Sequence, residues 1–240
     1  MVVLLLTCPA ADYQGRLPSF LAAVDSLKVE GDQPPETPDP AKAAGPGRVP
    51  TVEELNLGFE QVGEDPAKPK AWSVSGDGFV PDAPGYEVAI DDAEAKAGRR
   101  SLRMKGTGRG QFGNAYVSIP GAVAAGRRVK ISGWIKTKDV APRGYAGLWC
   151  RVDGPDGLLA HDNMVVRLDG KGGIKPDDRG VRGTTDWKRY SIEHDVPAGA
   201  TAIVFGALLT GDGTAWWDDY AIEVDGKPYP GPKPAAAKSE

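Results

Sequence analysis

The chain has little of several residue types on which common functional classes depend. Of its 240 residues, 2 are cysteine and 2 are histidine, and its net charge at pH 7 is -4. Nucleic-acid binding needs a clustered basic face, which this sequence does not offer, so nucleic acid is not expected as a partner. The apolar run within residues 1–11 is too short to cross a bilayer, so no transmembrane span is expected.

The two cysteines do not suggest a disulfide. Cys8 lies in the apolar N-terminal segment, whereas Cys150 alternates with polar residues and shares the spacing of the apolar ones. We therefore expect Cys150 to be a small buried hydrophobic residue.

Signatures of catalysis are also missing. Neither a G-x-S-x-G elbow nor an H-E-x-x-H motif occurs. Residues 108–113 match G-x-G-x-x-G, but no helix follows them, so we interpret them as a glycine-rich turn. Asp153 and Asp162 could form a glycosidase-type pair, although carboxylates are too common for this to indicate an enzyme. We predict that the protein is not an enzyme.

Glycine and proline, by contrast, are abundant, with 32 and 21 residues. They favour many turns over long helices, and they separate short segments in which apolar and polar residues alternate with a period of two. Short strands at this spacing predict an all-β fold, a β-sandwich. The predicted strands are residues 55–61, 71–75, 86–91, 101–105, 115–119, 127–137, 144–153, 164–168, 187–195, 201–209 and 214–224.

Composition divides the chain into four parts. Residues 1–29 combine an apolar start with one short helix, residues 30–54 form a proline-rich, disordered linker, residues 55–225 form the β-sandwich binding domain, and residues 226–240 form a disordered tail. The apolar start resembles the end of a secretory signal without its basic region. We expect a secreted or periplasmic protein, with Cys8 as a candidate lipid anchor. The alternative is a short apolar N-terminus that packs elsewhere.

One hairpin-like stretch, residues 144–167, is the candidate functional face. In its first arm, Tyr145, Trp149 and Arg151 alternate with apolar residues that would face the core. Such a face suits sugar recognition, because aromatic rings stack on the C–H surface of a pyranose and planar polar groups fix its hydroxyls. The predicted ligand-binding residues are Tyr145, Trp149, Arg151, His161, Asp162 and Asn163.

Each of these residues also has a purely structural interpretation. Trp149 could lie under a loop as part of a second small core, and Arg151 could pair with Asp153 or Asp162. Asp162 and Asn163 could equally form a turn in which their side chains bond backbone amides.

Three motifs occur in a fixed order along the predicted sandwich. They are Asn-Leu-Gly-Phe-Glu at residues 56–60, Gly-Arg-Arg-Ser-Leu at 98–102 and Trp-Trp-Asp-Asp at 216–219. This order resembles the carbohydrate-binding modules with a galactose-binding-like jelly roll, over about residues 55–224. The resemblance implies a jelly-roll β-sandwich that binds carbohydrate.

A closer likeness involves other segments of the second half, residues 149–153, 162–164, 183–187, 195–197 and 205–209. They are similar to an accessory domain that sits beside bacterial tail-specific serine peptidase domains and some other enzymes or regulators.

The resemblance also implies a structural calcium ion. In the resembling modules, the Glu of the opening motif and an Asp of the closing motif are calcium ligands, and here these correspond to Glu60 and Asp218. Strand alternation puts Asp218 on the core side with Tyr220, where a carboxylate must be paired or coordinated. The alternative is that Asp218 accepts hydrogen bonds from backbone N–H groups or pairs with a buried Arg or Lys.

The sequence therefore predicts a non-catalytic binding module for a carbohydrate or a cell-envelope polymer. The alternative is a structural or protein-interaction accessory domain, whose aromatic face docks a partner protein or an enzyme domain.

Overall fold

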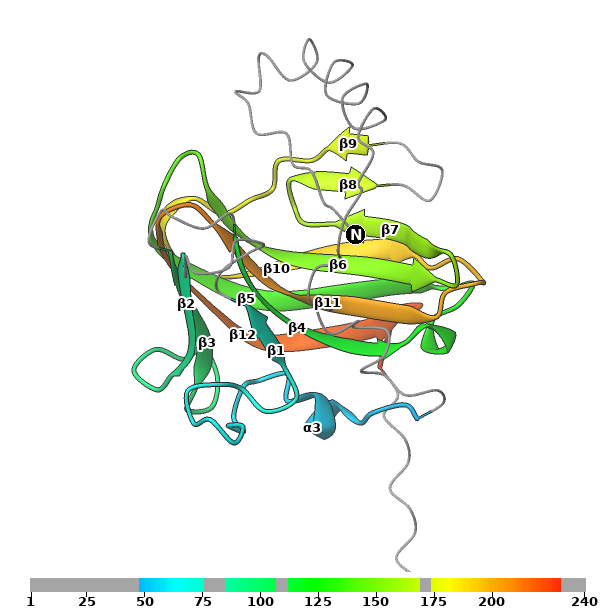
Figure 1. The fold of residues 1–240 in the computed structure, drawn as a ribbon, viewed down its shortest axis with the longest axis horizontal. Helices are drawn as coiled ribbons and strands as arrows, with labels where there is room; N and C mark the ends of the chain where they lie inside the picture. The colour runs from blue at the N-terminus through cyan, green and yellow to red at the C-terminus, as the bar shows by residue number, and fades with distance from the viewer. Residues whose placement is uncertain (1–47, 76–84, 107–111, 169–173, 230–240) are drawn as a thin grey trace, which may run out of the picture. The chain divides into compact units, whose positions relative to one another are not determined.

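A computed structural model describes residues 48–75, 85–106, 112–168 and 174–229 (Figure 1). These residues form two antiparallel sheets that pack face to face, which confirms the predicted all-β sandwich of jelly-roll type. The predicted N-terminal helix, the linker up to residue 47 and the tail from residue 230 lie outside the described residues.

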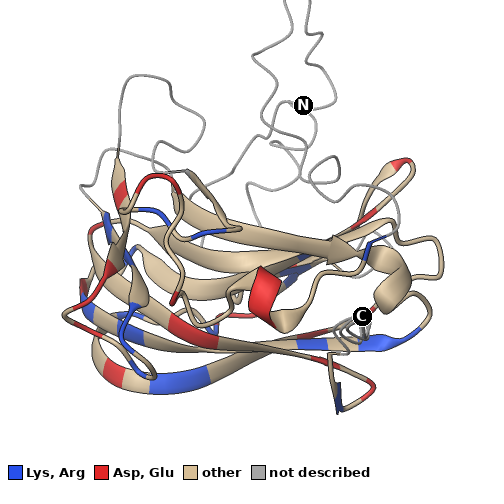
Figure 2. Ribbon diagram, turned by 90° about the horizontal axis from the view of Figure 1, so that it is seen from below, with Lys and Arg blue, Asp and Glu red and all other residues tan. Residues whose placement is uncertain are grey.

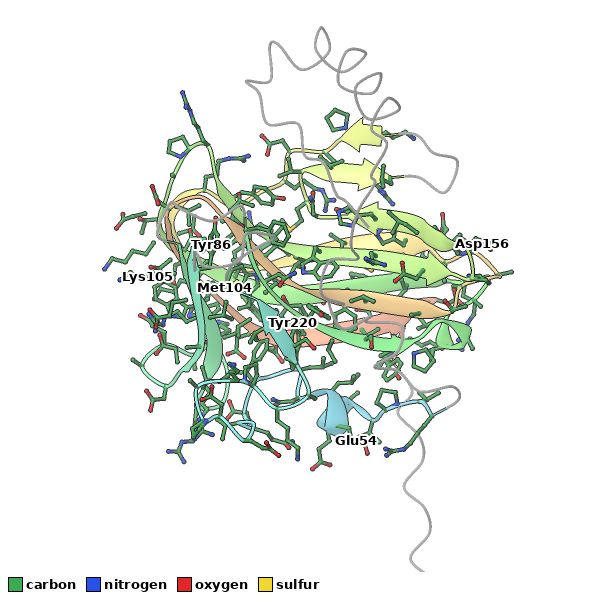
Figure 3. The ribbon with its side chains drawn as sticks, viewed as in Figure 1. Glu54, Tyr86, Met104, Lys105, Asp156 and Tyr220 are labelled. Atoms are coloured by element: carbon green, nitrogen blue, oxygen red, sulfur yellow. The ribbon has the colours of Figure 1, made fainter. Side chains whose placement is uncertain are left out.

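The seven-stranded sheet carries the predicted functional hairpin. Strands β6 (Tyr145–Gly154) and β7 (Gly157–Asp162) form this hairpin, with Asp156 at its tip (Figure 3). Strands β8 (Val166–Leu168) and β9 (Ile174–Pro176) extend the sheet beyond β7 (Figure 1). The central strand β11 is buried along nearly its whole length because both of its faces are apolar. In spatial order the strands are β1 (Ser73–Ser75), β4 (Gly113–Pro120), β11 (Ala202–Thr210), β6 (Tyr145–Gly154), β7 (Gly157–Asp162), β8 (Val166–Leu168) and β9 (Ile174–Pro176).

The six-stranded sheet closes the other side of the sandwich. A short 3-10 helix, Gly121–Val123, follows β4 and leads toward this sheet along the chain. In spatial order the strands are β10 (Gly183–Asp195), β5 (Arg128–Val140), β12 (Gly213–Val224), β3 (Ser101–Gly106) and β2 (Tyr86–Asp91), and β13 (Lys227–Pro228) pairs with β12.

The core lies between the two sheets and is built from alternate residues of the strands. In β6, Leu148 and Cys150 are fully buried, as their alternation predicts, and burial raises the pKa of the Cys150 thiol. They belong to one core cluster with buried residues of the other sheet, among them Ile135 and Trp217. The Trp217 indole N–H donates to the carbonyl oxygen of Gly147 at 3.1 Å, so a hydrogen bond also links the sheets.

The segment that enters the sandwich differs from the prediction of a strand at residues 55–61. It forms the helix α3 (Val52–Leu55), which begins at a capping box and ends at Asn56 in the left-handed conformation (φ 49°). The residues that follow fold into a loop. Leu57 and Phe59 are buried, as a strand pattern would require, but they reach the core from this loop.

The alternation in β12 is interrupted, so the prediction that Asp218 shares a face with Tyr220 is wrong. Asp219 has a φ of 48°, and the pairing of β12 with β5 shifts between Asp218 and Ala221. This bulge turns Tyr220 into the core, whereas Asp218 lies opposite Trp134 on the outside of the sheet. Asp218 is nevertheless fully buried.

Charged residues of both signs are interspersed over the strands and loops (Figure 2). In the part of the chain that the structure describes, no helix combines the length and the hydropathy that a membrane span needs.

Candidate ligand-binding face

The outer face of the seven-stranded sheet, which points away from the six-stranded sheet, carries the predicted aromatic residue of β6. Directly paired residues of antiparallel strands lie on the same face. The register therefore puts Trp149 of β6 beside Gly206 of β11, which is in turn paired with Tyr116 of β4. On the other side of β6, Arg151 is paired with His161 of β7.

An aromatic pair lies at the centre of this outer face. The rings of Tyr116 and Trp149 meet at a centroid distance of 5.9 Å and an interplanar angle of 65°. Gly206 between them leaves the space free, and a Cβ built there would lie 1.9 Å from the carbonyl oxygen of Ala115. The Trp149 indole N–H donates to the carbonyl oxygen of Ala207 at 3.2 Å. Its polar group is thus satisfied, and the half-buried ring is left to make contacts through its π surface.

Polar groups flank the aromatic pair on the β7 side. The Nε of Arg151 donates to both carboxylate oxygens of Asp153, at 2.9 and 3.0 Å, as one of the structural interpretations expects. The Asp153 side chain is 5% exposed and that of Arg151 29%, so solvent reaches the guanidinium rather than the carboxylate. The His161 ring lies 6.5 Å from that of Trp149. Burial lowers the pKa of His161, so its imidazole is neutral at pH 7.

Asp162 points to the inner face, opposite to the aromatic pair, because it is paired with the inward-facing Cys150. Its side chain is 1% exposed and accepts hydrogen bonds from Nη2 of Arg179 at 2.9 and 2.8 Å and from the N–H of Met164 at 2.7 Å. Arg179 also donates to the carbonyl oxygen of Ser191 in β10, at 3.1 Å. Asp162, Arg179 and the Ser191 carbonyl oxygen thus form a hydrogen-bonded link between the two sheets, which we call the clasp around Arg179.

Asn163 and Tyr145 also make structural contacts. The Asn163 side-chain oxygen accepts hydrogen bonds from the N–H groups of Val165 and Val166, so the turn interpretation describes it. Tyr145 shares the outer face but is four residues from Trp149, about 13 Å along the strand. Gly180 packs against its side chain, where an added Cβ would lie 2.7 Å from the Cβ of Tyr145 and 2.9 Å from its ring atom Cγ. Burial raises the pKa of Tyr145. The structure therefore does not bring these two residues to the aromatic pair.

Asp218, one of the two predicted calcium ligands, accepts hydrogen bonds from the backbone. Its Oδ2 accepts from the N–H groups of Lys96 and Ala97, at 2.7 and 2.9 Å, and its Oδ1 from that of Asp219 at 2.7 Å. Burial raises the pKa of Asp218 to about 6, although these N–H groups act in the opposite direction.

Glu60, the second predicted ligand, binds the same loop as Asp218. Its Oε1 accepts hydrogen bonds from the N–H groups of Arg99 and Arg100, at 2.8 and 3.1 Å. Gly98 allows this close approach, because it has a φ of 62° and a Cβ there would lie 2.1 Å from the same oxygen.

These contacts match the hydrogen-bonding alternative for Asp218 more closely than a calcium site. Amide hydrogens already point at both oxygens of Asp218 and at one of Glu60. Within the described residues there is no group of three or more His, Cys, Asp or Glu side chains that could hold a metal. Structural calcium stays a prediction, and this donor set does not fit the ion as it stands.

Sequence reasoning missed Tyr116 of the aromatic pair, its neighbour Asn114 on the same outer face, and Arg179, which binds Asp162. Asn114 and Tyr116 lie half-buried between buried residues of β4, so the alternation that identifies Trp149 could also have found them. Arg179 lies in the loop after β9, where no periodic signal marks it.

Comparison with known proteins gives one sequence relative. No family model matches the chain. The uncharacterized HTH-type transcriptional regulator YbfP of Bacillus subtilis (strain 168) is 32% identical over 160 residues, which cover 65% of this chain and 48% of the regulator. The chain thus spans about half the length of this curated relative. A match of this length cannot fit outside residues 48–229, so it includes much of the β-sandwich.

Solved structures that are similar to this chain include carbohydrate-binding modules. The CBM22-1 xylan-binding domain from Paenibacillus barcinonensis Xyn10C has a TM-score of 0.44 and 16% identity, and the match covers 70% of this chain and 91% of that domain. TmCBM61 in complex with beta-1,4-galactotriose has a TM-score of 0.41 and 13% identity, with 74% and 99% covered. At this level of similarity the comparisons do not identify a ligand, and the fold assignment rests on the sheets themselves.

Proposed function

We propose that the chain is a non-catalytic binding module whose outer face binds a carbohydrate. The observation that carries this proposal is the aromatic pair of Tyr116 and Trp149, which is flanked on the same face by the Arg151 guanidinium and the His161 imidazole. The proposed site is these four residues, and it spans strands β4, β11, β6 and β7.

The chemistry of these groups suits a pyranose, which has apolar C–H surfaces and a rim of hydroxyls. The Trp149 ring offers a π surface, since its N–H is already bonded to the backbone. The guanidinium of Arg151 supplies N–H donors, and a neutral imidazole supplies one donor and one acceptor. Small-ligand sites typically combine such apolar contacts with a few placed polar groups.

The positions of the Asp153 and Asp162 carboxylates support a function without catalysis. Asp153 lies on the outer face and is bound by Arg151, whereas Asp162 lies on the inner face and is bound by Arg179. Two carboxylates that point to opposite faces of one sheet cannot flank the same glycosidic bond, as a hydrolase requires.

Calorimetric titration of the full chain tests the proposal. Soluble oligosaccharides prepared from xylan and from beta-1,4-galactan, and muropeptide fragments of peptidoglycan, are suitable probes for the carbohydrate and cell-envelope classes. We expect saturable binding of at least one class, and a loss of about tenfold or more in affinity for Trp149→Ala. Lys188→Ala, an exposed change on the other sheet, is the matched control and should bind like the wild type.

The relative among transcriptional regulators favours a second candidate function, an accessory domain that docks a partner protein through the same face. A folded chain that binds no member of the glycan panel would favour this candidate. The association with tail-specific serine peptidases, export from the cytoplasm and a lipid anchor at Cys8 stay predictions. Fractionation of cells that express the wild type and Cys8→Ala tests export and the anchor.

A further inference from the structure

Asn114 in β4 has a side-chain oxygen that makes no hydrogen bond. This Oδ1 is buried, and it has no partner. The residue is paired with Leu208 of β11, two positions from the pair of Tyr116 and Gly206, so its side chain lies on the outer face next to the aromatic pair. An acceptor without a donor thus lies beside the proposed carbohydrate site.

A buried acceptor without a partner lowers stability, because its hydration is lost and nothing replaces it. On β11 the paired Leu208 is also buried and offers no polar group, and on the other side Asn114 is paired with Ser75 of β1. Since the Asn114 side chain as a whole is only half-buried, rotation about its own χ angles can bring the oxygen to the surface. That rotation breaks no hydrogen bond of this oxygen. A donor group of a ligand can therefore bind the oxygen without competing with a donor of the protein.

We infer that Asn114 is a specificity-determining residue of the proposed site, where its Oδ1 accepts a hydrogen bond from a ligand hydroxyl. The inference rests on the proposed function and adds β4 as the second polar edge of the site. His161 in β7 is three strand spacings from β4, on the order of 14 Å across the sheet. Its register row meets β4 at Ser118, and Asn114 lies four residues from there, about 13 Å along the strand. A ligand that contacts both edges is therefore an extended oligosaccharide rather than a single sugar.

Two variants of Asn114 separate a role in binding from a role in folding. Asn114→Leu removes the acceptor and fills a similar volume, and Asn114→Asp keeps acceptor oxygens but removes the amide donors. We expect the leucine variant to bind oligosaccharides of the xylan or galactan panel about tenfold more weakly. We expect it to be at least as stable as the wild type in urea denaturation, because the unsatisfied acceptor is gone. The aspartate variant should bind more tightly than the leucine variant.

The outcomes distinguish this inference from the proposed function. If the wild type binds no glycan of the panel, both fail. If the wild type binds, Trp149→Ala loses binding and Asn114→Leu binds normally, only the role of Asn114 is overturned. A clear loss of stability in Asn114→Leu would also contradict it, since it would show that the carboxamide has a partner within the fold. Equal affinity for a monosaccharide and a tetrasaccharide would contradict the extended ligand.

Discussion

At the scale of single residues, Gly206 decides whether the aromatic pair can form. It lies between Tyr116 and Trp149 on the central strand, and an added Cβ would lie 1.9 Å from the carbonyl oxygen of Ala115 and 2.8 Å from the Cα of Tyr116. Backbone atoms cannot move aside as the end of a flexible side chain can. The absence of a side chain at this position is therefore part of the proposed site.

Replacement of Gly206 by valine should destabilise the protein by about 1–3 kcal/mol, because the strands must shift to accept the side chain. It should also abolish oligosaccharide binding, since the rings of Tyr116 and Trp149 can no longer meet. Urea denaturation and calorimetric titration measure the two effects. If the valine variant had wild-type stability and bound normally, the close approach of β4 and β11 at Gly206 would be contradicted.

His194 is a second residue whose surroundings predict a measurable property. It is buried on the inner side of β10, its Nε2 has no hydrogen-bond partner, and burial lowers its pKa to about 4. The unfolded chain has a histidine pKa of about 6.5. A base whose pKa is lower in the folded state contributes stability above pH 6.5, and this contribution is lost as the pH falls toward 4.

The difference between the folded and unfolded pKa of His194 corresponds to a loss of free energy of unfolding on the order of 3 kcal/mol between pH 7 and pH 4. We expect His194→Gln to lose less free energy of unfolding than the wild type over this range. Asp218 acts in the opposite direction, because its raised pKa favours the folded state as the pH falls through about 6. The contribution of His194 is therefore read from the difference between variant and wild type. If the free energies of unfolding of the wild type and His194→Gln changed in parallel with pH, the lowered pKa of His194 would be contradicted.

At the scale of elements, the clasp around Arg179 holds the β7 to β9 extension against β10. Its guanidinium binds the buried Asp162 and the carbonyl oxygen of Ser191, and its Nε donates to Asp177 at 2.7 Å. Removal of one member of such a pair leaves a buried charge without a partner, which costs more than the pair contributes.

Arg179→Ala should therefore lower the free energy of unfolding by about 3–5 kcal/mol. The double variant Asp162→Asn/Arg179→Ala should lose less than the two single variants together, because the neutral amide no longer needs a cation. Urea denaturation of the four proteins completes the cycle. Additive losses would show that the two side chains do not interact.

Prediction from sequence succeeded where the period of two continues without interruption. In β6 it gave both the strand and its two faces, because nothing in this segment breaks the pleat. It failed at Asp218, since one left-handed residue at position 219 moves the next side chains to the other face. It also failed at residues 55–61, where a loop buries alternate residues as a strand would.

The candidate site was only partly predictable for a related reason. Alternation found Trp149 and Arg151, but a single strand does not reveal which strands lie beside it. The partner of Trp149 proved to be Tyr116, which is more than thirty residues away in the sequence and reaches it across β11. Asp162 and Asn163 lie close to Trp149 in the sequence, yet local hydrogen bonds use both side chains.

At the scale of the whole molecule, the loop at residues 94–100 joins the two ends of the folded chain through Glu60 and Asp218. Because backbone N–H groups already satisfy these carboxylates, we expect the melting temperature to be the same with 1 mM EDTA as with 1 mM calcium chloride, to within about 1 °C. A clear decrease in EDTA, reversed by calcium, would instead establish the calcium site that the sequence motifs imply.

The central claim is that the outer face of the seven-stranded sheet binds an extended carbohydrate at the aromatic pair. It is tested most directly by calorimetric titration of the full chain, wild type and Trp149→Ala, with oligosaccharides from xylan and beta-1,4-galactan. The account predicts saturable binding by the wild type and a loss of about tenfold or more in the variant, with both proteins folded. Equal binding by the two proteins, or no binding by a folded wild type, would contradict it.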